Sequence, residues 1–271
     1  REALRLVEGL GLNNLVVEAS APTDETALRE LRERSLGLTR ADAAAALAVV
    51  PGAQSSAAEK RLRTDAVASD HAASDAQAVG VTPSFFALSS LAVAEGRALS
   101  DEDERRIAPV AVLGHQAART LFPDGNAVGQ AVKVNHVWLD VVGVLVDRDL
   151  SAEAFEGVQL GLETNRVYVP LSTALIRFAS PPMQDELDRL LVRLESPEGI
   201  EAGARTLSAL LRERHAGAND FRLVVPAQLF RQHQQTQRIF RVVMGAIAAV
   251  SLLVGGIGIM NIMLASVLER T

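Results

Sequence analysis

The feature that most constrains this chain is a run of 27 residues near its C-terminal end without a charged side chain. The run extends from Val242 to Leu268 and contains the stretch "SLLVGGIGIMNIML". As a helix it would be about 40 Å long, which exceeds the roughly 30 Å hydrocarbon layer of a bilayer. Uninterrupted apolar runs of about 18 residues or more are typical of membrane spans. We therefore predict a transmembrane helix over 242–268. A buried helix of a soluble domain is the alternative.

The glycines of this run favour helix packing over phosphate binding. "GGIGIMN" has a GxG spacing, but a dinucleotide-binding fingerprint needs a preceding strand and a third glycine, and this chain has Asn261 at that position. No GxxxxGK[ST] motif occurs anywhere, so the chain carries no phosphate-binding loop of the ATPase kind. In lipid, small residues let helices approach closely, and a polar residue such as asparagine bonds to a neighbouring helix. The predicted packing positions are Gly245, Ala249, Ser251, Gly255, Gly256, Gly258 and Asn261.

Composition and spacing exclude several other classes of function. The chain has no cysteine, which removes disulfides, thiolate metal sites and thiol nucleophiles. Its net charge is −6 and its basic residues are scattered, so it offers no clustered basic surface for nucleic acid. The nearest approach to a metal cluster is Asp70, His71 and Asp75, which we interpret as a solvated loop. We predict no catalytic, cofactor or metal site in this chain.

Residues before the apolar run contain two similar strand–helix–strand patterns. In the first, the strand "NLVVEAS" precedes a helix that Thr39 caps with Asp42 at capping-box spacing, and that ends at Pro51-Gly52. The β-compatible stretches "QSSAAEKRLR" and "AQAVGVT" follow. In the second, "LDRLLVRLES" precedes a helix with Ser196 as cap, Pro197 at its first position and Gly217 at its end, and "DFRLVVPA" follows as a strand. We interpret these patterns as a split βαβ unit.

A block with a different pattern of apolar and polar residues separates these two strand–helix–strand patterns. "APVAVLGHQAARTLFP" indicates a strand, a glycine turn and a short helix, and "AVGQAVKVNHVWLDVVGVLVD" alternates as paired strands do. "ETNRVYVPLSTALIRFA" adds a strand and a short helix, whereas the acidic run 100–106 indicates an exposed turn or a helix start. The sequence thus predicts an α+β fold in which a smaller α/β subdomain, 100–180, is inserted into the split βαβ subdomain.

Several segments of the chain together resemble one family. "SLLVGGIGIMNIMLASVLERT" closely resembles the second transmembrane helix of MacB-type ABC transporter permeases, within the FtsX-like superfamily. "GVTPSFFALSSLAVAEGRALSDED", "VAVLGHQAARTLFPDGNAVGQAVKVN", "DVVGVL", "NRVYVPLSTALIR" and "LRERH…DFRL" are similar to further segments of that family, in the same order. The resemblance covers about residues 10–271. Each motif except the glycine-rich helix is weak alone, and together they indicate the family.

The resemblance implies a division of the whole chain. Residues 1–11 would be the end of the first membrane helix or its stalk, residues 12–99 and 181–228 a porter-like subdomain, and residues 100–180 the inserted subdomain. Residues 229–241 would be a stalk helix, 242–268 the second membrane helix, and 269–271 the start of a cytoplasmic segment. Glu269 and Arg270 would then lie toward the ATPase.

The resemblance also implies a function without catalysis in this chain. The chain would be part of an ABC exporter permease in the bacterial inner membrane, with residues 12–228 in the periplasm. ATP and Mg²⁺ would bind at a nucleotide-binding domain elsewhere, and their action would reach the periplasm mechanically, for efflux of drugs or other amphipathic or peptide substrates. Implied partners are the ABC ATPase domain or subunit, a second permease copy, and, in an efflux system, a periplasmic adaptor and an outer-membrane channel. Two alternatives stay open: a lipoprotein-releasing or signalling permease of the same superfamily, and a soluble α/β ligand-binding domain with a hydrophobic tail.

Overall fold

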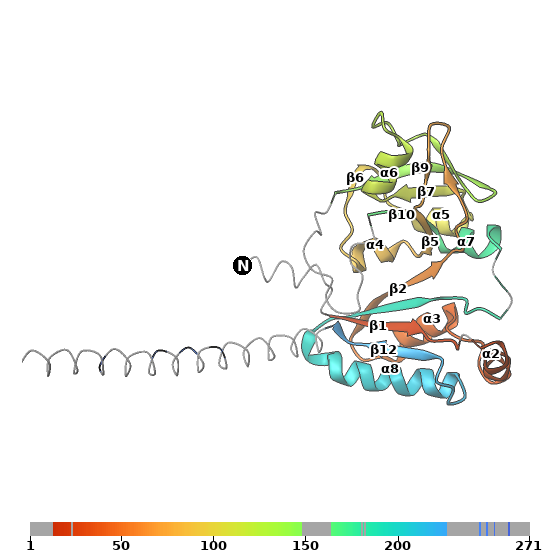
Figure 1. The fold of residues 1–271 in the computed structure, drawn as a ribbon. Helices are drawn as coiled ribbons and strands as arrows, with labels where there is room; N and C mark the ends of the chain where they lie inside the picture. The colour runs from red at the N-terminus through yellow and green to blue at the C-terminus, as the bar shows by residue number, and fades with distance from the viewer. Residues whose placement is uncertain are drawn as a thin grey trace, which may run out of the picture. The chain divides into compact units, whose positions relative to one another are not determined.

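The computed structural model describes residues 13–22, 24–147, 164–179, 181 and 183–226, together with the single positions Met244, Ala248, Leu252 and Met260. The chain divides into one unit that ends at Pro226 and another that begins at Ala227. Every helix and strand with described bounds lies in the first unit (Figure 1). Within the described residues, no helix has the length and apolar character that crossing a membrane requires. Apart from the four single positions, the helices predicted at 1–11, 229–241 and 242–268 lie outside the described residues.

Strands and short helices alternate along the first unit. The strands are β1 (Asn14–Ala19), β2 (Ala53–Arg61), β3 (Val67–Ala68), β4 (Ala73–Ser74), β5 (Gln77–Val81), β6 (Val93–Gly96), β7 (Val110–Leu113), β8 (Ala131–Val134), β9 (Val137–Leu145), β10 (Arg166–Pro170), β11 (Arg189–Leu194) and β12 (Phe221–Val224). The helices are α2 (Glu25–Arg32), α3 (Arg40–Val49), α4 (Ser84–Leu88), α5 (Asp101–Arg105), α6 (His115–Leu121), α7 (Leu171–Arg177) and α8 (Ile200–Arg214), with a 3₁₀ turn, η2 (Pro197–Gly199), before α8.

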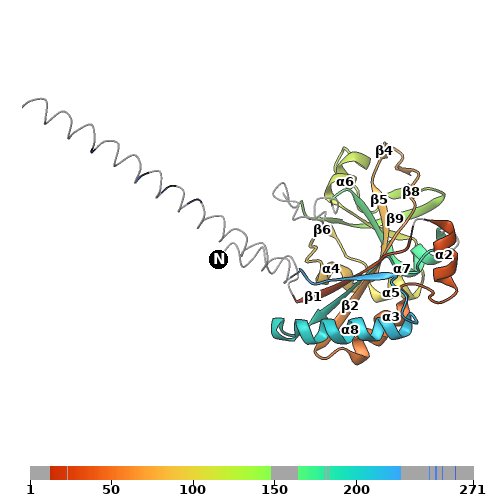
Figure 2. The ribbon, with the colours of Figure 1, turned by 60° about the horizontal axis from the view of Figure 1, so that its bottom comes forward.

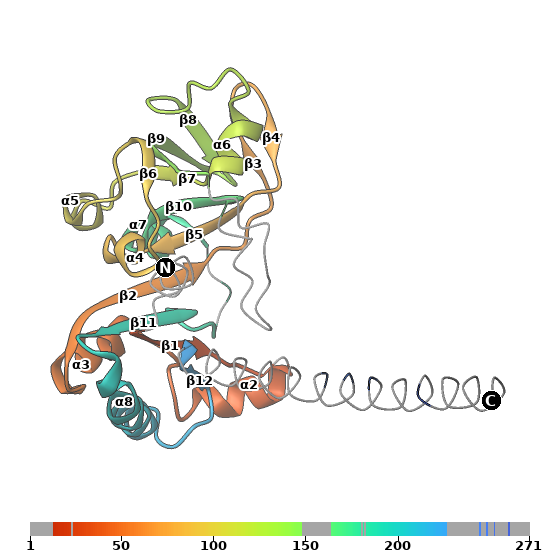
Figure 3. The same ribbon diagram turned by 90° about the vertical axis from the view of Figure 1, so that its left-hand side faces the viewer.

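The described strands form one 12-stranded sheet, so the fold is mixed α+β and dominated by its sheet. The strand order is β12-β1-β11-β2-β5-β10-β7-β9-β8-β3-β4, and β6 pairs with β9. Strand β2 lies between β11 and β5, as Figure 3 shows. Strand β2 therefore joins β1, β11 and β12 to the strands between residues 67 and 170.

The split βαβ unit predicted from the sequence is confirmed by the strand pairing. Strand β11 lies between β1 and β2 and is antiparallel to both. Strand β1 in turn lies between β11 and β12 and is antiparallel to both. Each half thus inserts one strand between the two strands of the other half, which is the arrangement of ferredoxin-like folds. Helices α3 and α8 connect the strands of each half and lie side by side against the same face of the sheet (Figure 2).

The predicted helix boundaries of this unit follow from local chemistry. Thr39 and Asp42 form the expected capping box at the start of α3. Ser196 accepts a hydrogen bond from the backbone of Glu198, and Pro197 opens the 3₁₀ turn that leads into α8. Gly217 follows the end of α8 with φ of +74°, a conformation that glycine adopts without strain.

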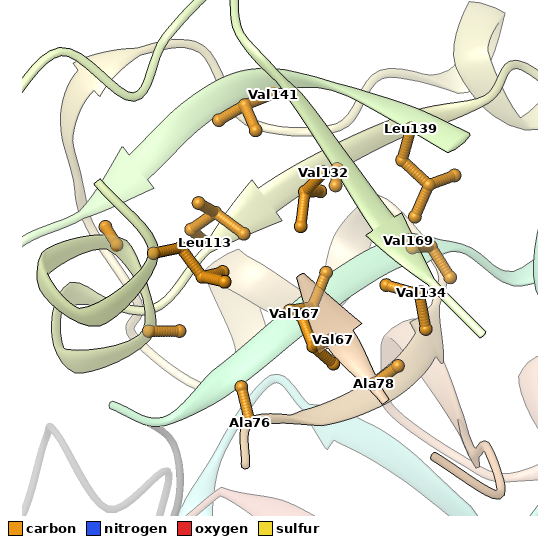
Figure 4. Close-up of a cluster of buried hydrophobic side chains, with 14 of the residues drawn as sticks. Val67, Ala76, Ala78, Leu113, Val132, Val134, Leu139, Val141, Val167 and Val169 are labelled. Atoms are coloured by element: carbon orange, nitrogen blue, oxygen red, sulfur yellow. The ribbon is translucent and has the colours of Figure 1, made fainter. Parts of the chain in front are cut away.

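The strands between residues 67 and 170 enclose a core of their own. Its buried side chains include Leu113, Val132, Val141 and Val167, which converge between strands in Figure 4. Strands β3 and β5 pair with β8 and β10, so residues 67–81 share this part of the sheet with the block 100–180. The division into a discontinuous subdomain and an inserted one, with boundaries at 99 and 181, stays a prediction.

Two glycines allow β6 and β9 to meet closely. Gly96 pairs with Gly143 next to an irregularity in the ladder, and Gly96 has φ of +75°. A Cβ atom at Gly143 would lie 2.3 Å from the backbone oxygen of Arg97. The glycine of "EGR" and the glycine of "DVVGVL" therefore serve one contact between two backbones.

Candidate functional site

The residues that the sequence proposed for helix packing and coupling lie outside the described part of the chain. They are Gly245, Ala249, Ser251, Gly255, Gly256, Gly258, Asn261, Glu269 and Arg270. Their roles stay predictions. Among the described residues no group of His, Cys, Asp and Glu could hold a metal ion. The fold does assemble two networks of charged side chains, each containing buried carboxylates, one on each face of the sheet beside β12. We take these networks as the candidate site.

The first network, the His215 cluster, consists of His215, Asp42, Asp220, Arg214 and Ser35. His215 caps the C-terminal end of α8, Asp42 lies in the first turn of α3, and Asp220 immediately precedes β12. The His215 Nδ1 atom lies 2.7 Å from Asp220 Oδ1, and its Nε2 atom lies 3.4 Å from Asp42 Oδ2. The imidazole and both carboxylates are almost completely buried. One ring thus faces a carboxylate at each nitrogen.

This geometry favours the protonated imidazolium. Only the charged ring has a hydrogen on both nitrogens and can donate toward both carboxylates. Burial by itself would lower the pKa of His215, but the hydrogen bond with Asp220 and the negative charges of Asp42 and Asp220 outweigh burial and raise that pKa above its ordinary value. Burial likewise opposes ionisation of Asp42, yet the nearby His215 ring and the hydrogen bonds from Arg214 and Thr39 hold its pKa well below the usual range.

Further donors hold the two carboxylates in place. Ser35 Oγ donates to Asp220 Oδ2 over 2.5 Å, and Arg214 Nε lies 2.5 Å from Asp42 Oδ1. The backbone N–H and the hydroxyl of Thr39 both donate to Asp42 Oδ2. The cluster therefore ties together the loop before α3, the start of α3, the end of α8 and the start of β12.

The second network is a row of alternating charges across four neighbouring strands, formed by Arg222, Glu18, Arg189 and Glu59. Glu18 on β1 pairs in register with Arg222 on β12 and with Arg189 on β11. Arg189 in turn pairs in register with Glu59 on β2. The N–O distances along the row are 2.6, 3.5 and 3.6 Å. Opposite charges at paired positions of one sheet face stabilise that register.

The inner end of this charge row is a fully buried carboxylate. Glu59 is 0% exposed, and its Oε1 atom lies 3.8 Å from Arg166 Nη1 and 3.6 Å from Arg61 Nε. Within the described residues, neither oxygen of Glu59 accepts a hydrogen bond. Because Arg166 begins β10, Glu59 connects the split βαβ strands electrostatically with the strands of the second core.

The acidic run after Gly96 forms a third, smaller contact. The sequence predicts an exposed turn or helix start at 100–106, and the structure shows the short helix α5 with a capping box of Ser100 and Asp103. Asp103 is buried, however, because Arg97 binds it with two hydrogen bonds of 2.5 and 3.0 Å. These bonds from Arg97 outweigh burial and lower the pKa of Asp103 to about 2.

We expect the Arg97–Asp103 pair to stabilise the fold in a pH-dependent way. Its contribution is present above the ordinary carboxyl pKa of 3.8 and disappears as the pH falls toward 2, where folded Asp103 takes up a proton. Arg97→Gln should therefore lower the free energy of unfolding by about 1 kcal/mol at pH 7, a modest value because Arg97 is half exposed. Urea unfolding should show that difference vanishing near pH 2, whereas Arg63→Gln, which removes an exposed pair, should have little effect at either pH. A difference that stays constant between pH 7 and pH 2 would contradict this role.

Comparisons with known proteins agree on one family. Residues 6–210 match the family model described as the MacB-like periplasmic core domain. The chain is 34% identical over 197 residues to the macrolide export ATP-binding/permease protein MacB of Chromobacterium violaceum, covering 73% of this chain and 29% of that protein. It is 38% identical over 190 residues to the pyoverdine export ATP-binding/permease protein PvdT of Pseudomonas entomophila, covering 69% of this chain and 27% of that protein. The match thus spans less than a third of these relatives' length.

Two solved structures share the fold. The periplasmic region of MacB from Actinobacillus actinomycetemcomitans superposes with a TM-score of 0.63 at 20% sequence identity, covering 87% of this chain and 98% of that one. The extracellular domain of the ABC-type transporter YknZ from Gram-positive bacteria gives a TM-score of 0.60 at 17% identity, covering 78% of this chain and all of that one. At such identities the likeness concerns the architecture alone.

Proposed function

The chain belongs to the family of MacB-like periplasmic core domains, and from this premise we propose that it is the periplasmic domain and second membrane helix of an ABC exporter permease. In this proposal, ATP hydrolysis at a nucleotide-binding domain outside residues 1–271 moves the membrane helices, and the periplasmic domain converts that movement into substrate export. The observation that carries the proposal is a periplasmic-domain match followed, in the same chain, by 27 residues without a charge.

The four described positions of the uncharged run are compatible with this role. Met244, Ala248, Leu252 and Met260 are helical, and the side chains of Met244, Leu252 and Met260 are exposed. Exposed apolar side chains on a helix suit contact with lipid or with another membrane helix. Gly255, Gly256 and Asn261 would then form the packing surface, and Glu269 and Arg270 would face the ATPase.

The relatives' names favour export over the other permease functions. The two relatives described above are named for export of a macrolide and of pyoverdine. We therefore propose export of drugs or of other amphipathic or peptide compounds for this chain. A second permease copy, a periplasmic adaptor and an outer-membrane channel would complete the pathway.

Cysteine labelling can test the proposed topology cleanly, because the chain has no native cysteine. Asp124→Cys places a thiol at an exposed position of the periplasmic domain, and Arg270→Cys places one after the apolar run. In intact spheroplasts, a membrane-impermeant maleimide should label Asp124→Cys at once and should label Arg270→Cys only after permeabilisation. Equal labelling of both sites before permeabilisation would refute a membrane span between them.

Export itself is tested in inverted membrane vesicles that contain the transporter assembled from the chain and its ATPase. Radiolabelled macrolide or pyoverdine should accumulate with ATP and should not accumulate with a non-hydrolysable ATP analogue. Deleting residues 13–226 should abolish accumulation while leaving the ATPase present. If neither compound accumulates in an ATP-dependent way, while a lipoprotein is released from the same membranes, the lipoprotein-releasing alternative replaces the exporter.

A further inference from the structure

Strand β12 is attached to the sheet on one side only. It is an edge strand of four residues, and among the described strands it pairs only with β1. Phe221, Leu223 and Val224 are partly buried, Arg222 is exposed, and Val225 directly after the strand is buried. An edge strand that pairs with a single neighbour is expected to open before the rest of a sheet.

Charged groups also hold β12, on both faces of the sheet. On the face covered by α3 and α8, the Asp220 carboxylate forms hydrogen bonds with the His215 ring and with the Ser35 hydroxyl. The backbone oxygen of Asp220 also accepts a hydrogen bond from the N–H of Ser20. On the opposite face, Arg222 is bound to Glu18. The ring of Phe221 also packs edge-on against the His215 ring, with 5.5 Å between centroids. The start of this strand therefore depends on the His215 cluster in addition to its own packing.

The charge balance of the cluster depends on one proton. Asp42, Asp220 and Arg214 are the charged groups that face His215, one from α3, one from the segment before β12 and one from α8 itself. With His215 protonated, two negative charges meet two positive charges. When the ring loses its proton, one buried negative charge is left without compensation, and a lone pair replaces a donor opposite a carboxylate.

We propose that the His215 cluster is a protonation-dependent anchor that fixes β12 to the periplasmic domain, at the strand through which the domain continues toward residue 227. This inference rests on the proposed function only in the role that it gives to the anchor. A domain that is moved through its membrane segment needs its last strand fixed to its core. Loss of the proton releases the start of β12 while the remaining strands stay paired. Because the folded-state pKa of His215 is raised, the anchor holds fully below the ordinary value of 6.5 and loosens as the pH rises past the raised value.

Hydrogen exchange of the purified chain, followed by mass spectrometry, tests the anchor. His215→Gln keeps a polar side chain of similar size but cannot carry the charge. At pH 7 it should increase exchange of backbone amides in 218–226 about tenfold, while peptides from β5, β7 and β10 keep their protection. His136→Gln, in an exposed turn, is the matched control and should leave every peptide unchanged.

The pH dependence of exchange in the unsubstituted chain supplies a second measurement. After correction for the intrinsic pH dependence of exchange, protection of 218–226 should decrease between pH 6 and pH 9 relative to β5, and His215→Gln should abolish this step. A variant that exchanges like His136→Gln, or one that loses protection equally throughout the sheet, would overturn the anchor. These results do not depend on export: an anchor without ATP-driven transport would refute the exporter alone, and transport without a local pH step would refute the anchor alone.

Discussion

Replacing Gly143 with alanine should lower the free energy of unfolding by about 3 kcal/mol. The new Cβ atom would lie 2.3 Å from the backbone oxygen of Arg97 and 3.1 Å from its carbonyl carbon. Backbone atoms cannot rotate away as a side chain does, so β6 must move away from β9 and break the ladder at Gly96. Because Arg97 also binds Asp103, this movement would disturb α5 as well.

Urea unfolding of the variant measures this cost, and the chain offers a matched control. Gly199 has φ of −75°, and a Cβ atom added there meets no atom within 4 Å. Gly199→Ala should therefore change the free energy of unfolding by no more than about 0.5 kcal/mol, with a small gain possible from the less flexible unfolded chain. Equal losses for the two substitutions would show that the close contact between β6 and β9 is not what requires Gly143.

Much of this fold follows from short-range sequence signals. The capping box at Thr39, the Ser196-Pro197 start before α8 and the glycine turn between β7 and α6 all depend on residues within a few positions of one another. Each was predicted, and each is confirmed. Three elements were missed. Helix α2 carries local signals that we did not use, since Asp24 caps it and Glu25 pairs with Arg29 one turn later. Strands β3 and β4 have two residues each, and β3 is placed by pairing with the distant β8, which no local pattern encodes.

The candidate site could not be predicted, because its residues are adjacent only in space. Asp42 has a correct local interpretation as a capping residue, and nothing near it in sequence indicates His215 as a partner. "LRERH…DFRL" contains both His215 and Asp220, but we used it only as part of a resemblance. A histidine at a helix end with an aspartate five residues later, before a strand, is a signal that we overlooked. Glu59 and Lys60 give a similar signal, because two adjacent charged residues lie in strand β2 directly after the buried Ala57 and Ala58.

Glu59 is the position where a single substitution should disturb the second network most. Glu59→Ala should lower the free energy of unfolding by about 3 to 5 kcal/mol, because it leaves the buried guanidinium of Arg166 without an opposing charge. Arg189 still has the Glu18 carboxylate 3.5 Å away in this variant, and the half-exposed Arg61 is solvated by water. Most of the destabilisation therefore comes from the unpaired charge of Arg166. The damage should spread across the sheet, since Glu59 connects β2 with β10.

A double substitution separates the unpaired charge from the loss of packing. Glu59→Leu with Arg166→Leu should recover most of the stability that Glu59→Leu alone loses, because apolar side chains can replace a buried ion pair with little cost. Glu25→Ala, which removes an exposed pair with Arg29 on α2, should cost less than about 0.5 kcal/mol in the same urea titration. If Glu59→Ala proved as mild as Glu25→Ala, water would have to reach Glu59 and Arg166 in the folded protein. The charge row would then be a set of solvated surface pairs that do not link the two parts of the sheet.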